Sequence, residues 1–395
     1  MPNLETLAVI AVLLVVAFLF AQIAAHAGLP PAAAIVLVGI AAGGMLPRDL
    51  QIELTPGALA LFLPALIFEA AWSVDAAALK RTAWAIVVLA VPGVLFTGAA
   101  IAAAGILGGR LVPAAAFALG VILAATDPVA VLALFRKLSV PTDLLTIVEG
   151  ESIANDGVAA VLAQSIVAMS VSGAAFDPAR SAEAFAYSCG AGIAIGLGVA
   201  ALGTPLLRRL RTPWVGIATT LAIAYGSYAL ASIAGASGIF ASAAAGVALP
   251  TLAFDKDEVR AINRFWDGTA FVANSIVFLL VGLSLQLDRI FGEPLLFLAV
   301  VAAVVISRGI LAYAFVPLGG AAGARPGWRH AIALAGVRGG LSLALALGLP
   351  KNFPDRGAVL DAVFAVVFLT IVIQGWTLAP LLRRIDLREV VRRVA

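Results

Sequence analysis

The sequence predicts an all-α polytopic membrane protein, and three observations carry this prediction. Of the 395 residues, 63% are hydrophobic and only 12% are charged. Soluble domains are about half apolar and about a quarter charged. The apolar residues fall into runs of about 20, the length that an α-helix needs to cross a bilayer. Lys and Arg gather in the short segments between these runs, as they do in the loops of membrane proteins.

We expect about 13 transmembrane helices in a single membrane unit that covers residues 1–395. The second and ninth apolar runs are short, so these helices have to be tilted or shielded by their neighbours. The expected spans are about 6–25, 31–46, 57–72, 83–106, 112–136, 145–170, 183–204, 214–234, 237–251, 265–285, 294–318, 329–349 and 357–381.

The distribution of charge predicts the orientation of the chain. Of the 25 Lys and Arg residues, 17 fall on one side of this arrangement and 6 on the other. The positive-inside rule then places the N-terminus outside and the C-terminus in the cytoplasm, where 383–395 form a short basic tail. We expect no soluble regulatory domain in the chain. The net charge of +3 is too small and scattered for binding nucleic acid, and two His and one Cys do not make a usual zinc site.

The 13 helices divide into six, one and six, and the odd linking helix inverts the second six relative to the first. The fifth helix is interrupted at 126–128, because Pro128 removes a backbone donor and disfavours helical geometry at Asp127. The twelfth helix, its counterpart in the second six, carries three glycines around Arg338 at 336–340. Broken helices at matching positions of inverted repeats point to a transport site.

Two acids fall at the same depth on neighbouring helices. Asp127 lies about nine residues from the inner end of its helix, and Asp156 lies about eleven residues into the next. At about 1.5 Å per residue both are roughly 14–16 Å deep, near the midplane of a core about 30 Å thick. Helical spacing puts Ser152 and Glu149 on the same face as Asp156. The carboxylates of Asp127 and Asp156 can therefore face each other.

The oxygen-rich composition of this region indicates its chemistry. Carboxylate, hydroxyl and backbone carbonyl oxygens suit a hard cation such as Na⁺. Carbonyls freed at the break around Thr126 can add ligands. A bare carboxylate is costly at this depth, so it crosses the membrane neutralised by either a cation or a proton. Because the two compete for one site, the arrangement is sufficient for exchange.

The other charges inside the spans need partners, because lone charges at this depth are costly. Glu69 in the third helix and Arg338 in the twelfth are expected to pair with each other, or with Asn155 and Glu151, a second helical pair turned about 100° from Asp156. For Arg308 in the eleventh helix, a snorkelling position at the membrane surface remains open.

At these residues the chain resembles a known family, the prokaryotic Na⁺/H⁺ antiporters of the monovalent cation:proton antiporter-1 (NhaP-like) group. The resemblance runs through most of the chain. It rests on Leu66–Trp72 (LIFEAAW), Thr126–Pro128 (TDP), Glu149–Ser152 (EGES), Asn155–Gly157 (NDG), Ser237–Gly238, Asn274–Gly282 (NSIVFLLVG) and Val337–Gly340 (VRGG), all in the family's order.

The resemblance implies a homodimer in the prokaryotic cell (inner) membrane, in contact with membrane lipids. Interface helices at about 1–72 and 183–285 would carry ion-binding core helices at about 83–170 and 294–381, which move like an elevator. The ligands implied for Na⁺ or Li⁺ are Asp127, Ser152, Asp156 and the Thr126 backbone, with Glu151 nearby through water. Asn155 implies electroneutral one-for-one exchange, and with Arg338 and Glu69 it would stabilise the core.

Other readings remain open at this point. Oxygen ligands alone do not separate Na⁺/H⁺ from K⁺/H⁺ exchange. An intramembrane aspartyl protease also uses two Asp on neighbouring helices, but the Gly-Asp dipeptide of its pattern does not occur in this sequence. A passive cation channel would conduct without proton coupling. We expect a transporter rather than an enzyme, with no cofactor, which serves pH homeostasis.

Overall fold

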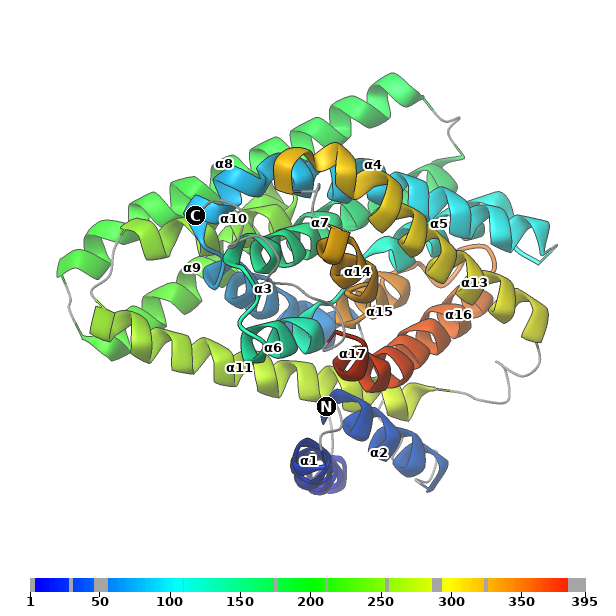
Figure 1. Cartoon of the computed structure of the whole chain (residues 1–395), viewed down its shortest axis with the longest axis horizontal. Helices are drawn as coiled ribbons and strands as arrows, with labels where there is room; N and C mark the ends of the chain where they lie inside the picture. Colours follow the sequence, from blue (N-terminus) through cyan, green and yellow to red (C-terminus); the bar gives the residue numbers. More distant parts are fainter. Residues whose placement is uncertain are drawn as a thin grey trace.

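The computed structural model describes residues 4–27, 31–45, 56–108, 110–173, 177–209, 212–252, 256–285, 293–322 and 326–382. Within these ranges every regular element is helical and no strand occurs, so the all-α class is confirmed (Figure 1). The expected basic tail at 383–395 lies outside the described residues.

The first half of the described chain runs from α1 to α7. The helices are α1 (Leu4–His26), α2 (Pro31–Met45), α3 (Pro56–Trp72), α4 (Ala76–Leu107), α5 (Pro113–Ala124), α6 (Val129–Lys137) and α7 (Thr142–Ser172). Local chemistry explains several ends. The Asp75 side chain accepts a hydrogen bond from the Ala78 amide at 2.7 Å and caps α4. Gly173, with φ of 64°, ends α7 in the left-handed conformation that glycine tolerates.

The second half runs from α8 to α17. The helices are α8 (Pro178–Arg209), α9 (Pro213–Ile233), α10 (Gly238–Leu252), α11 (Lys256–Ser284), α13 (Pro294–Ile310), α14 (Pro326–Leu334), α15 (Gly340–Leu347), α16 (Arg356–Leu369) and α17 (Gly375–Leu382). A π-helical turn at Leu311–Phe315 continues α13, and another at Thr370–Gln374 joins α16 to α17.

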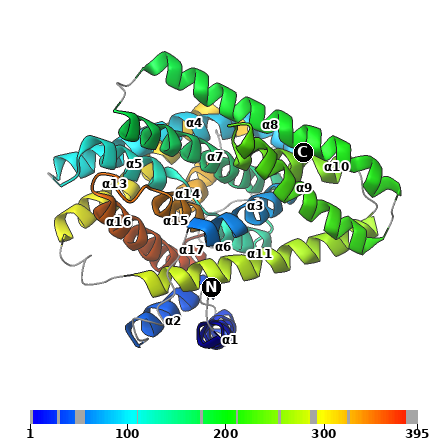
Figure 2. The same cartoon turned by 180° about the vertical axis from the view of Figure 1, so that it is seen from behind.

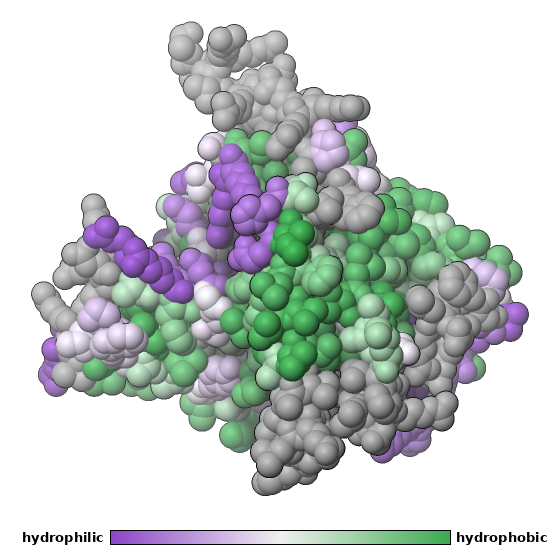
Figure 3. Space-filling model, turned by 90° about the horizontal axis from the view of Figure 1, so that it is seen from below, coloured by the Kyte–Doolittle hydropathy of each residue, from purple (hydrophilic) through white to green (hydrophobic). Residues whose placement is uncertain are grey.

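The described helices have the composition and surface of a multi-pass membrane protein. Seven of them are long and apolar enough to cross a bilayer, and other apolar helices in the described ranges are shorter. Each expected span contains a helix of the structure, but the count of 13 crossings and the orientation of the termini stay predictions. Large apolar side chains lie on the outside, among them Leu202, Trp214 and Ile233, each more than 80% exposed. The space-filling view shows a broad hydrophobic surface with hydrophilic residues toward its edges (Figure 3).

The helices pack in two groups, and α6, α14 and α15 lie between them (Figures 1 and 2). In both cartoon views α8, α9 and α10 lie at one side, and α5, α13 and α16 lie at the other (Figures 1 and 2). The long helix α4 packs along α5, α7 and α13, whereas α10 packs along α3, α8 and α9. This grouping is compatible with the expected core and interface helices, and their relative movement stays a prediction.

Both expected interruptions are present, and they cross. Residues 125–128 separate α5 from α6, and 335–339 separate α14 from α15. The Asp127 amide donates to the Val337 carbonyl at 2.7 Å, which joins the two unwound segments. The Ser342 hydroxyl donates to the Ile122 carbonyl at 2.9 Å and ties α15 to α5 beside the crossing. The two breaks therefore form one central structure.

Candidate functional site

Asp127 lies at the crossing, where two half-helices begin. The backbone amide of Val129, the first residue of α6, donates to its carboxylate at 3.1 Å, and Gly339, directly before α15, lies against the same carboxylate. A helix N-terminus carries a positive partial charge, so the start of α6 stabilises the carboxylate as an anion. A Cβ on Gly339 would lie 2.0 Å from the Asp127 carboxylate oxygen, so this position has room only for glycine.

Asp127 and Asp156, the latter on α7, line one cavity, which has a volume of about 410 Å³. Oδ1 of Asp156 is buried and makes no hydrogen bond within the described residues. A buried oxygen without a partner is costly, which makes it a candidate ligand for a cation or a carrier of a proton. The expectation that Asp127 and Asp156 lie together is confirmed. Thr126, Ser152 and Glu69 also line this cavity.

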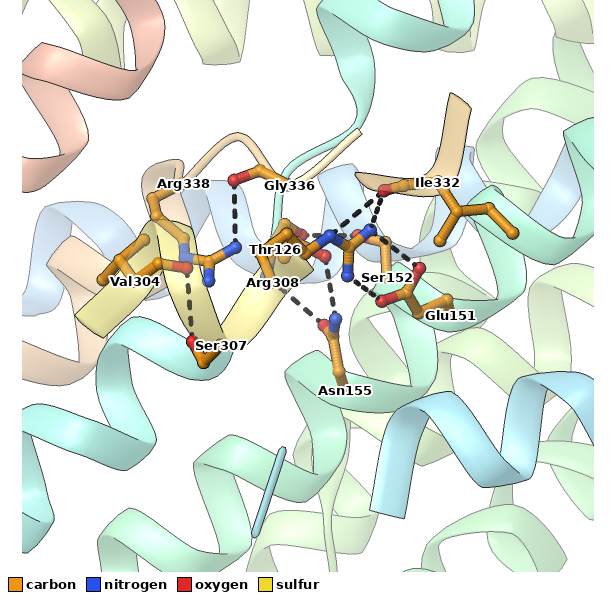
Figure 4. A network of polar contacts seen from close by, with 10 residues as sticks. All are labelled: Thr126, Glu151, Ser152, Asn155, Val304, Ser307, Arg308, Ile332, Gly336 and Arg338. Carbon is orange, nitrogen blue, oxygen red and sulfur yellow. Dashed lines mark hydrogen bonds and ion pairs between the residues drawn. The ribbon is translucent and has the colours of Figure 1, made fainter. Parts of the chain in front are cut away.

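Ser152 and Asn155 hold the broken segment of α5–α6 against α7. The Ser152 hydroxyl donates to the Thr126 carbonyl at 2.5 Å. The Asn155 amide nitrogen donates to the Thr126 hydroxyl at 2.7 Å, and the Asn155 oxygen accepts from the Thr126 amide at 3.4 Å (Figure 4). Ser152 lines the cavity and Asn155 does not. Asn155 therefore positions the loop, while Ser152 and Thr126 lie at the site itself.

Glu151 pairs with Arg308, the arginine whose position in the membrane the sequence left open. Both Glu151 oxygens accept from Arg308 on α13, and one of these bonds, from Nη2 to Oε2, measures 3.1 Å (Figure 4). Arg308 also donates from Nη2 and Nε to the Ile332 carbonyl near the end of α14, at 2.6 and 3.1 Å. Arg308 is only 6% exposed, so the snorkelling alternative is wrong. Its signal in the sequence was a charge inside an apolar run.

Within the described residues no ion pair joins Glu69 to Arg338, so that expected pairing is wrong. The alternative partners, Asn155 and Glu151, bind Thr126 and Arg308 instead. Arg338 is 1% exposed, and its Nη1 donates to the Gly336 carbonyl at 3.0 Å. Its amide donates to the Thr370 hydroxyl at 3.1 Å. The unwound segment leaves carbonyls free, and one of them accepts from Nη1 in place of a carboxylate, whereas Nε makes no hydrogen bond within the described residues. Glu69 lines the cavity instead.

Glu149 forms a further ion pair beside the cavity. Its Oε1 lies 3.0 Å from Nη2 of Arg136, at the end of α6. A second cavity of about 310 Å³ adjoins the first one there, and the residues that line both are Glu69, Ser73, Arg136 and Asp267. The sequence indicated that Glu149 shares the face of Asp156, but it contained no signal for its partner, because that pairing depends on how α6 packs on α7.

Comparisons with known proteins agree with this architecture. A family model described as the transmembrane sodium/hydrogen exchanger matches residues 10–384. The chain is 34% identical over 385 residues to the Na⁺/H⁺ antiporter NhaS2 of Synechocystis. The aligned region covers 96% of this chain and 70% of that protein. It is also 34% identical over 338 residues to the Na⁺/H⁺ antiporter ApNhaP of Aphanothece halophytica, covering 83% of this chain and 64% of the relative.

The fold is also known. The structure of the sodium proton antiporter MjNhaP1 from Methanocaldococcus jannaschii at pH 8 aligns with a TM-score of 0.80 and 20% identity, covering 98% of this chain and 99% of that one. That likeness shows the fold, and the family match shows the lineage. The expected relationship to the Na⁺/H⁺ antiporters is confirmed. The protein is therefore a multi-pass membrane transporter rather than an enzyme. The chain belongs to the sodium/hydrogen exchanger family.

Proposed function

We propose that the protein exchanges Na⁺ or Li⁺ for H⁺ across the cell membrane. The observation that carries this proposal is the pair Asp127 and Asp156 in one cavity, with Oδ1 of Asp156 unpartnered. A cation or a proton can neutralise this pair, and the two compete. The curated relatives are named Na⁺/H⁺ antiporters, which supports Na⁺ over the K⁺ alternative.

The cation ligands in this proposal are the carboxylates of Asp127 and Asp156, the Ser152 hydroxyl and the Thr126 carbonyl. Ser152 and the Thr126 carbonyl already lie 2.5 Å apart, so a cation entering between them replaces the hydrogen bond that they make. Glu151 was expected to reach the cation through water. Both of its oxygens are taken by Arg308, so we propose that it stabilises the core together with Arg308.

Access is proposed from the cytoplasmic side. The second cavity, of about 310 Å³, is lined by Trp72, Leu145 and Val259, which lie at or near the ends of α3, α7 and α11. Lys80, Arg136 and Arg260 lie in the same region of the chain as these ends, on the side that the positive-inside rule assigns to the cytoplasm. The cavity in this conformation is thus proposed to face inward. Elevator-like movement, a homodimer, one-for-one stoichiometry and a prokaryotic inner membrane remain part of the proposal.

The test is transport in liposomes that contain the purified protein, a pH dye and a preset pH gradient. Na⁺, Li⁺, K⁺ and choline are added in turn, with the membrane potential free or clamped. Dissipation by Na⁺ or Li⁺ but not by choline, independent of the potential, is the expected result. Equal activity with K⁺ would favour the K⁺/H⁺ alternative. No proton movement with any cation, in folded protein, would refute exchange.

A further inference from the structure

A buried acid, Glu149, lies beside the place where the two cavities adjoin, and the proposed ligand set does not use it. Glu149 is 2% exposed at its side chain and lines the inner cavity that holds Asp127 and Asp156. Its Oε1 accepts from Arg136, whereas its Oε2 is buried and makes no hydrogen bond within the described part of the chain. Half of this carboxylate is therefore available to a ligand.

Arg136 is placed as a replaceable partner of that acid. Its side chain is 49% exposed, and its Nη2 also donates to the Ser73 hydroxyl at 3.3 Å. Because water screens a half-exposed guanidinium, the ion pair between Arg136 and Glu149 is weakened. Glu69 and Asp267 line both cavities together with Arg136. If the Arg136 guanidinium leaves Glu149, it therefore remains in a lining that contains two other carboxylates.

We propose that Glu149 is an outer binding site for the transported monovalent cation, and that Arg136 is a tethered counter-ion that occupies it when no cation is present. The cation displaces Arg136 and then moves inward to Asp127 and Asp156. This inference rests on the proposed exchange function. It means that Glu149 and Arg136, which lie outside the ligand set around Asp127 and Asp156, determine the affinity with which the cation is taken up from the side of the second cavity.

The test compares the Na⁺ KM and the maximal rate of exchange for Glu149→Gln, Arg136→Gln and the double variant in liposomes, with Na⁺ presented to the cavity side at mildly alkaline pH. Glu149→Gln is isosteric and removes the site, so the KM is expected to rise by about fivefold, the upper range for a partly exposed charge pair. Arg136→Gln removes the competitor and lowers the KM by a similar factor. In the double variant, loss of Arg136 has no further effect, because its target is absent.

Arg81→Gln is the matched control. Arg81 pairs with Asp143 at 2.8 Å near the start of α7 and lines neither cavity, so its loss leaves the KM unchanged. A wild-type KM in folded Glu149→Gln overturns the inference, whether or not Arg136→Gln folds. So does an effect of Arg136→Gln that persists in the double variant, since that is a general field effect. An inactive wild-type protein would instead refute the exchange function itself.

Discussion

The two acids of the cavity, Asp127 and Asp156, differ in their hydrogen bonding. The Asp127 carboxylate accepts a hydrogen bond from the Val129 amide at the start of α6, whereas Oδ1 of Asp156 has no hydrogen-bond partner within the described residues. A carboxylate held by helix N-termini is stabilised as an anion. Asp156 is thus the member of the pair whose neutralisation depends most on what enters the cavity.

Asp156→Asn is therefore expected to abolish exchange while the protein stays folded, because the amide keeps the shape of the side chain and removes its charge. The measurement is Na⁺-driven proton movement in liposomes, with thermal unfolding as the check on folding. Asp143→Asn, which removes an acid that pairs at the partly exposed start of α7, is the matched control and should retain exchange. Wild-type turnover in Asp156→Asn would refute the site.

At the scale of elements, the crossing of the two broken helices depends on Gly339. Gly339→Ala is expected to displace the Asp127 carboxylate, because the new Cβ would lie 2.0 Å from its oxygen. Exchange should fall strongly even in protein that folds. In Gly309→Ala, on α13, the added Cβ meets nothing within 4 Å, so this variant is the control. Equal activity of the two variants would show that the crossing does not position Asp127.

The pair of Glu151 with Arg308 joins α7 to α13 and, through the Ile332 carbonyl, to α14. Removing one member of a buried pair costs about 3–5 kcal/mol, because the other charge is left without a partner. Arg308→Leu should therefore lower the unfolding temperature by several degrees. Replacing both, in Glu151→Leu with Arg308→Leu, should recover part of that loss. If Arg308→Leu unfolds like the wild type, the pair is not structural.

At the scale of the whole molecule, some features follow from local sequence and others do not. The break at Pro128 and the glycines around Arg338 have local causes, so both interruptions were predictable. Helical spacing also placed Ser152 with Asp156. The partners of Arg308 and Arg136 were not predictable, because pairing between helices depends on their register and packing. The error at Glu69 came from considering only side chains as partners of a buried arginine, whereas the unwound segment supplies the Gly336 carbonyl.

If a proton and a cation compete for the carboxylates of Asp127 and Asp156, as proposed, binding of the cation releases a proton. Purified protein in weakly buffered solution with a pH dye is titrated with NaCl, with choline chloride as the control. Each Na⁺ bound is expected to release about one proton from the wild type and none from Asp156→Asn. Na⁺ binding without proton release in the wild type, across the pH range in which the protein stays folded, would contradict the account.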